Sequence, residues 1–142
     1  MQYLSRRLVY ALFYILLVHT SSASAAFMTQ AVSFVSQAPS GNWAQPWQDF
    51  CEEASAVMTA HFLWQRPLTS SIAAQEIQII KRYEEIVFGR YRDTSIEETA
   101  QILRELYGFS GIRLREVARA EDLTEELAQG AILIWQVPHK LE

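Results

Sequence analysis

The spacing of apolar residues changes from helical to strand-like after Gly108, and this change limits the folds that the sequence can adopt. From Cys51 to Gly108, apolar side chains recur at steps of three and four residues, which is typical of amphipathic helices. After Gly108 the pattern becomes strand-like, with alternation over 112–117 and a continuous apolar run over 131–137. Helices that precede strands, rather than alternating with them, predict an α+β domain.

Breaker and capping residues divide the helical part of the sequence. The first helix is expected from about Cys51 until shortly before Pro67, and Ser70 and Ser71 are expected to cap the second, which stops at Gly89. The second helix is expected to bury an apolar stripe of Ile72, Ile79, Ile80, Tyr83 and Val87.

A third helix is predicted to open with a capping box of Thr94 and Glu97 and to end at Gly108. A short helix over 121–129 follows the first of the two later strands. One more strand is expected over 31–36, where apolar and polar residues alternate. Half of the 142 residues are hydrophobic and one fifth are charged, a balance that suits a single globular domain.

The N-terminus has the three-part pattern of a secretory signal. A basic pair, Arg6 and Arg7, precedes an unbroken apolar run over 8–18, and small residues follow over 19–26. This apolar run is shorter than the about 20 residues that cross a bilayer. No stable membrane span is therefore expected after cleavage, although an uncleaved N-terminal anchor is the alternative.

Cleavage of the signal is expected after Ala25 or Ala26. Residues 1–26 are then the signal peptide and residues 27–142 the mature domain. The mature domain is expected to be secreted or periplasmic. The whole chain has a net charge of -4 and no cluster of lysines and arginines beyond the N-terminus, which indicates no nucleic-acid binding.

Cys51 is the only cysteine in the chain. Exported domains usually pair their cysteines in disulfides, so a single one is a candidate free reactive thiol. The alternative is a buried cysteine that fills the core as a small hydrophobe. Three scattered histidines and one cysteine match no zinc-ligand spacing, and no metal or other cofactor is expected.

The position of Cys51 at a predicted helix start favours a nucleophile, because a helix N-terminus lowers the pKa of a thiol. Glu52 and Glu53 are expected to complement the helix dipole rather than to form an acid–base pair. Gln37 lies at the end of the first predicted strand. Its side-chain amide is a suitable second donor, beside the Cys51 N–H, for the oxyanion of a tetrahedral intermediate.

Two tryptophans and a histidine lie near this cysteine in the sequence. Trp43 and Trp47 either form the wall of a substrate-binding cleft or cover the helix. His61 lies about three turns beyond Cys51, roughly 15 Å along the helix axis. It is therefore too distant to be the base for the thiol, and we expect a half-buried helix histidine.

The stretch QAPSGNWAQPWQDFCEEASAVM, residues 37–58, resembles the C39-like cysteine peptidases of the papain-like superfamily. The likeness continues through GRYRDTSIEETAQIL and LAQGAILIWQVPHKLE, and so covers nearly all of residues 27–142. It implies a papain-like fold with an N-terminal helical part and the first strands of a sheet. It also implies hydrolysis of peptide bonds in a peptide or protein substrate, with Cys51 as the nucleophile and Gln37 as the oxyanion-hole residue.

The sequence departs from this family in the second half of its active site. Members carry a histidine base and an Asp or Asn that orients it on strands that come later. Here His139 is the only late histidine, and it precedes the expected position. We therefore expect the N-terminal portion of such a domain, inactive as given, with His139 as an alternative base. The rival functions are a non-catalytic exported binding or structural module and an acyltransferase or amidase.

Overall fold

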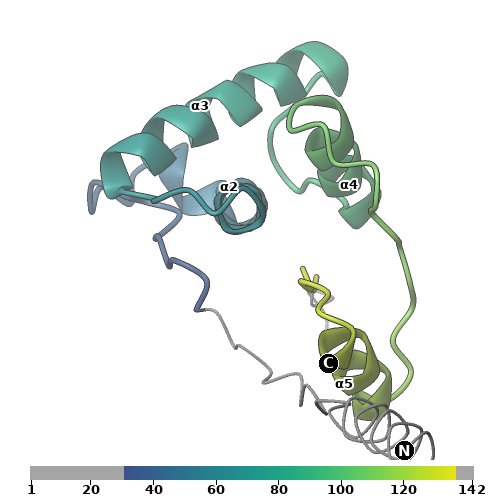
Figure 1. Cartoon of the computed structure of the whole chain (residues 1–142). Coiled ribbons are helices and arrows are strands. Elements are labelled where there is room, and N and C mark those ends of the chain that lie inside the picture. The colour runs from purple at the N-terminus through teal and green to yellow at the C-terminus, as the bar shows by residue number, and fades with distance from the viewer. Residues whose placement is uncertain (1–30, 137–142) are drawn as a thin grey trace, which may run out of the picture. The chain divides into compact units, whose positions relative to one another are not determined.

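The computed structural model describes residues 31–136. Residues 1–30 and 137–142 lie outside the described part, and with them the predicted signal peptide and His139. The described residues form a short 3-10 helix and four α-helices (Figure 1). Their bounds are η1 Trp47–Asp49, α2 Cys51–Leu63, α3 Ser70–Val87, α4 Ile96–Glu105 and α5 Ala120–Ala128.

The prediction of an α+β, papain-like fold is wrong for the described part of the chain. None of residues 31–136 belongs to a β-strand, so the segments 31–36, 112–117 and 131–136 run as irregular chain. An alternating pattern selects which side chains face a core, but a strand also needs a neighbouring strand to complete its hydrogen bonds. These three segments do not provide that pairing for one another. The described residues are therefore helical.

Helix α2 lies at the centre of the helical part and packs against both α3 and α4 (Figure 1). Small residues such as Ala56 and Ala60 are completely buried along α2, which lets neighbouring helices approach closely. The largest fully buried apolar side chains of the core are Phe50, Ile77, Ile80, Ile102 and Val57. Irregular segments add to this core, because Val35, Ile112 and Ile134 pack against it.

The helix ends follow local sequence, with shifts of one residue in the caps. The hydroxyl of Thr69, and not that of Ser70, accepts the first-turn N–H of α3. A capping box opens α4 as predicted, but it is formed by Ser95 and Glu98. Gly108 follows the end of α4 with a φ of 77°, a conformation that glycine adopts without strain.

The buried face of α3 differs from the predicted stripe. Ile79 and Val87 are 54% and 44% exposed. The residues that face the core are Ala73, Ile77, Ile80 and Glu84, which also follow helical spacing. A carboxyl group therefore takes the last position of the buried stripe.

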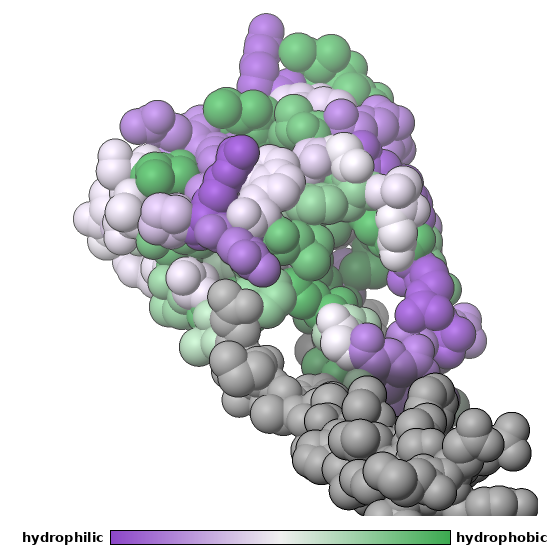
Figure 2. Space-filling model, in the orientation of Figure 1, coloured by the Kyte–Doolittle hydropathy of each residue, from purple (hydrophilic) through white to green (hydrophobic). Residues whose placement is uncertain are grey.

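The surface of the helical part is mixed in polarity. In the space-filling view, apolar side chains lie among charged ones and do not form one continuous apolar face (Figure 2). Among the helices described over 31–136, none has the length and apolar character needed to cross a membrane.

Replacing Phe50 by alanine should lower the free energy of unfolding by about 3–5 kcal/mol. The Phe50 ring is fully buried, and its centroid lies 5.5 Å from that of Trp47 in an edge-to-face contact. The substitution removes this packing and leaves a cavity beside the start of α2. Phe34→Ala is the matched control, because Phe34 is 83% exposed. Urea unfolding checks the prediction, and equal losses in the two variants would contradict the position of Phe50 in the core.

Candidate functional site

Cys51 is the first residue of α2, as predicted from the helical spacing that follows it. Its side chain is exposed, and the thiol donates a hydrogen bond to Glu52 Oε2 at 2.8 Å. No side chain caps the N-terminus of α2, which follows Phe50. The arrangement places an accessible sulfur beside the positive end of a helix dipole.

The pKa of the Cys51 thiol is raised to about 12, whereas the sequence predicted a lowered value. Partial burial of the sulfur is the main cause, and the hydrogen bond to the Glu52 carboxylate and its negative charge are the next. Glu53 adds a smaller repulsion of the same sign. Burial, together with the two glutamates, therefore outweighs the lowering effect of the backbone N–H of Glu52, and the protonated thiol is favoured at neutral pH.

The side chain of Gln37 reaches the loop that leads into α2. Its Nε2 donates to the backbone carbonyl of Gln48 at 2.6 Å and contacts that of Trp47 at 3.4 Å. Gln48 lies three residues before Cys51, so Gln37 fixes the loop that precedes the nucleophile candidate. A role at an oxyanion requires Nε2 to release the longer of these contacts, because the amide has only two N–H donors.

The two tryptophans of this loop lie in different environments. Trp47 packs its ring against Phe50 and is partly buried on the hydrophobic core. Trp43 is 57% exposed. Trp47 thus covers the start of α2, and Trp43 has the exposed surface that a binding residue needs.

His61 lies near the opposite end of α2 from the Cys51 thiol. It is buried near the end of α2, where Nε2 lies 2.8 Å from Glu76 Oε1 and Nδ1 lies 3.1 Å from the carbonyl oxygen of Pro67. The second carboxylate oxygen of Glu76 accepts from the hydroxyl of Tyr107 at 3.1 Å. Both ring nitrogens of His61 are engaged, and it is the only histidine among residues 31–136. The described residues therefore place no histidine base at Cys51.

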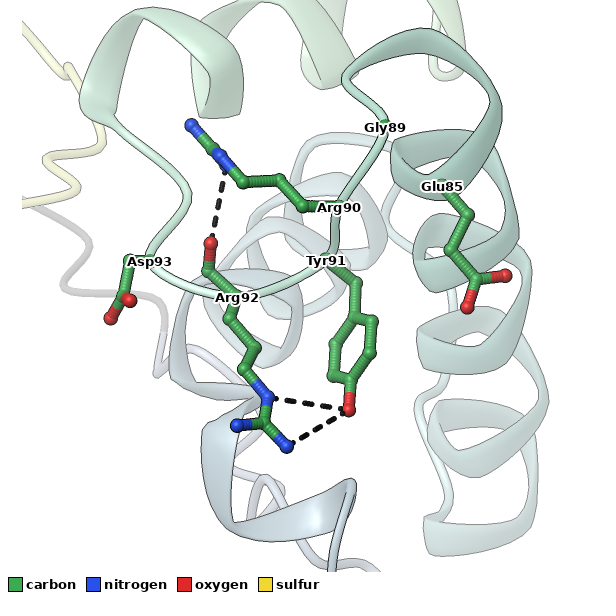
Figure 3. Close-up of a pocket in the computed structure, with 6 residues that line it drawn as sticks. All are labelled: Glu85, Gly89, Arg90, Tyr91, Arg92 and Asp93. Carbon is green, nitrogen blue, oxygen red and sulfur yellow. Dashed lines mark hydrogen bonds between the residues drawn. The ribbon is translucent and has the colours of Figure 1, made fainter.

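A pocket lies away from Cys51, at the loop between α3 and α4 (Figure 3). It has a volume of about 560 Å³ and is lined by Glu85, Gly89, Arg90, Tyr91, Arg92 and Asp93. Arg90 forms an ion pair with Glu98 at 2.9 Å, and Arg92 forms one with Asp49 at 3.1 Å. These charges are neutralised within the protein, so the pocket has no unpaired arginine to attract an anion.

Two acids, Glu53 and Glu84, are buried although their burial is not predicted from the sequence. Glu53 is expected from the sequence to complement the helix dipole, yet it is 1% exposed and faces the inside of the helical part. The signal was present in the spacing, because Glu53 continues the buried face formed by Ala56, Val57 and Ala60. Within the described residues, no three His, Cys, Asp or Glu side chains are grouped closely enough to hold a metal ion.

Comparison of the chain with protein-family models, with curated proteins and with solved structures finds no match.

Proposed function

We propose that the protein is an exported cysteine peptidase-like domain that uses Cys51 as the nucleophile of an acyl transfer. The observation that carries this proposal is the exposed Cys51 thiol at the first residue of α2, directly after a loop held by the Gln37 side chain. The quoted motif resemblance to C39-like peptidases adds support. The substrate class is a peptide or protein, whose scissile carbonyl reacts with the Cys51 sulfur.

In the proposed reaction the Cys51 thiolate attacks the carbonyl carbon and forms a tetrahedral oxyanion. The Cys51 N–H and the Gln37 amide donate hydrogen bonds to this oxyanion, which lowers the barrier. The C–N bond then breaks, the amine leaves with a proton, and water hydrolyses the thioester. No histidine within residues 31–136 is placed to take the thiol proton, because His61, the only one there, is engaged by Glu76 and Pro67.

A non-catalytic binding module is the second candidate function. The observation that favours it is the hydrogen bond from the Cys51 thiol to Glu52, together with the raised pKa of Cys51. A peptidase acts through the thiolate, and this arrangement favours the thiol. An acyltransferase or amidase shares the nucleophile and oxyanion donors of a peptidase and differs in the acceptor or in the bond that it breaks.

Trapping of the acyl-enzyme tests the proposed function. The full chain is incubated at pH 9 with a peptidyl p-nitrophenyl ester, and the modified residue is identified by mass spectrometry. We expect a hydroxylamine-sensitive thioester on Cys51 that is missing in Cys51→Ala. A chain that iodoacetamide alkylates at Cys51, but that the ester does not acylate there, would contradict the proposal and favour the binding module.

The chain as given should show no appreciable turnover of a fluorogenic peptide library. Residues 31–136 place no histidine base beside the thiol and no histidine that could protonate the leaving amine, a general-acid contribution of about 10²–10⁴-fold. His139→Ala is the informative variant, because His139 is the only late histidine. Measurable cleavage that His139→Ala abolishes would contradict this expectation and identify His139 as the base.

A further inference from the structure

Two glutamates from different helices bury their carboxyl groups together. Glu53 is in the first turn of α2 and is 1% exposed, and Glu84 is in the last turn of α3 and is completely buried. The two carboxyl groups lie within reach of a hydrogen bond to each other. Thr94, which is also buried, precedes α4 and faces the same pair.

The pair has fewer donors than it has acceptor oxygens. The Thr94 hydroxyl donates to Glu84 Oε1 at 3.1 Å. Among the described residues no group donates to Glu84 Oε2 or to either carboxyl oxygen of Glu53. A buried carboxylate without donors carries a large desolvation cost, which a proton on one of the two groups removes.

The charges around the pair increase this cost. Glu52 on α2 and Glu98 on α4 both act on it with the same negative sign. Arg90, from the loop before α4, is the cation next to Glu98 and forms an ion pair with it at 2.9 Å. The thiol of Cys51 is a further titratable neighbour, on which the charge of Glu53 acts.

We propose that Glu53 and Glu84 share at least one proton at neutral pH, so that a protonated carboxyl of one donates a hydrogen bond to the other. This bond joins the first turn of α2 to the last turn of α3, and Thr94 adds the segment before α4. It also gives Glu53 and Glu84 the hydrogen bond that two ionised carboxylates cannot form. Loss of the last shared proton leaves two like charges buried side by side, which weakens the contact between these helices.

The direction of the pKa shifts agrees with this arrangement. Burial raises the pKa of Glu53, and the charge of Glu84 raises it further. Burial also raises the pKa of Glu84, while the hydrogen bonds from Glu53 and Thr94 limit the increase. In the unfolded chain a glutamate releases its proton near its ordinary pKa of about 4.3. Above that pH, Glu53 and Glu84 in the folded protein still hold protons that the unfolded chain has released. The stabilisation is complete below that pH and is lost as the pH rises through the raised values.

Equilibrium unfolding of the full chain between pH 5 and pH 9 tests the proposal. The folding equilibrium constant should fall by up to about tenfold per pH unit for each proton that the pair retains. Glu53→Gln should flatten this slope by about one proton, because its amide donates permanently to Glu84. Glu97→Gln is the matched control, since Glu97 is an exposed glutamate in the first turn of α4, and it should leave the slope unchanged.

A ¹³C NMR titration of the glutamate carboxyl carbons of the unsubstituted chain decides the question without any variant. The carbons of Glu53 and Glu84 should still titrate at or above neutral pH. Ordinary titration of both Glu53 and Glu84 near pH 4 would overturn the proposal. An unchanged slope in a folded Glu53→Gln chain would overturn it too. If that variant does not fold, the titration alone gives the answer.

Discussion

Iodoacetamide should alkylate Cys51 roughly a hundredfold more slowly at pH 7 than it alkylates an unperturbed cysteine. The pKa of the Cys51 thiol is raised to about 12, which lowers its thiolate fraction at pH 7 by about 10³-fold relative to an ordinary thiol. A more basic thiolate is also more nucleophilic, and this restores about one order of magnitude or slightly more. The rate should keep rising with pH to at least about pH 10, because the thiolate forms only as the pH approaches the pKa.

Glu52→Ala tests the cause of this low reactivity. It removes both the carboxylate that accepts from the thiol at 2.8 Å and its charge. We expect alkylation of Cys51 at pH 7 to become about tenfold faster. The rest of the increase in the thiol pKa should remain, because burial is its larger cause. Glu97→Ala removes an exposed glutamate from the first turn of α4 and should change nothing. A rate in the unsubstituted chain that levels off below pH 8 would show that the thiolate is already formed.

The helices could be predicted from the sequence because their signals are local. The start of α2 at Cys51 and the ends of α3 and α4 before Gly89 and Gly108 follow from spacing and from glycine conformations. The one-residue error in the capping box of α4 has a tertiary cause. Thr94 was assigned to the cap, but its hydroxyl is used by Glu84 from another helix.

The strands could not be predicted reliably, because a strand depends on a partner that the local pattern does not specify. The alternating segment 112–117 has the composition of a strand, yet it has no ladder partner among residues 31–136. The prediction of a lowered pKa for the Cys51 thiol was wrong for a related reason. The helix start favours a thiolate, whereas the partial burial of the Cys51 sulfur and the side-chain direction of Glu52 are three-dimensional facts that reverse the expectation.

Gln37→Ala should slow acylation of Cys51 by about 10²–10³-fold, the usual effect of removing one oxyanion donor. Acylation by an ester passes through a tetrahedral oxyanion, and alkylation by iodoacetamide does not. The substitution should therefore leave the alkylation rate nearly unchanged. The substitution also removes the hydrogen bond from Gln37 Nε2 to the backbone carbonyl of Gln48, so this carbonyl loses its donor. Gln48→Ala is the matched control, because it removes an exposed glutamine side chain from the same loop and keeps that carbonyl.

The ratio of these two rates at Cys51 is the most direct test of acyl transfer at this site. It is measured by mass spectrometry on the full chain at pH 9, with a peptidyl p-nitrophenyl ester in one series and iodoacetamide in the other. The proposed function predicts a ratio of acylation to alkylation that falls by about 10²–10³-fold in Gln37→Ala and stays constant in Gln48→Ala. A ratio that Gln37→Ala leaves unchanged would contradict the assignment of Gln37 and Cys51 as an oxyanion donor and its nucleophile.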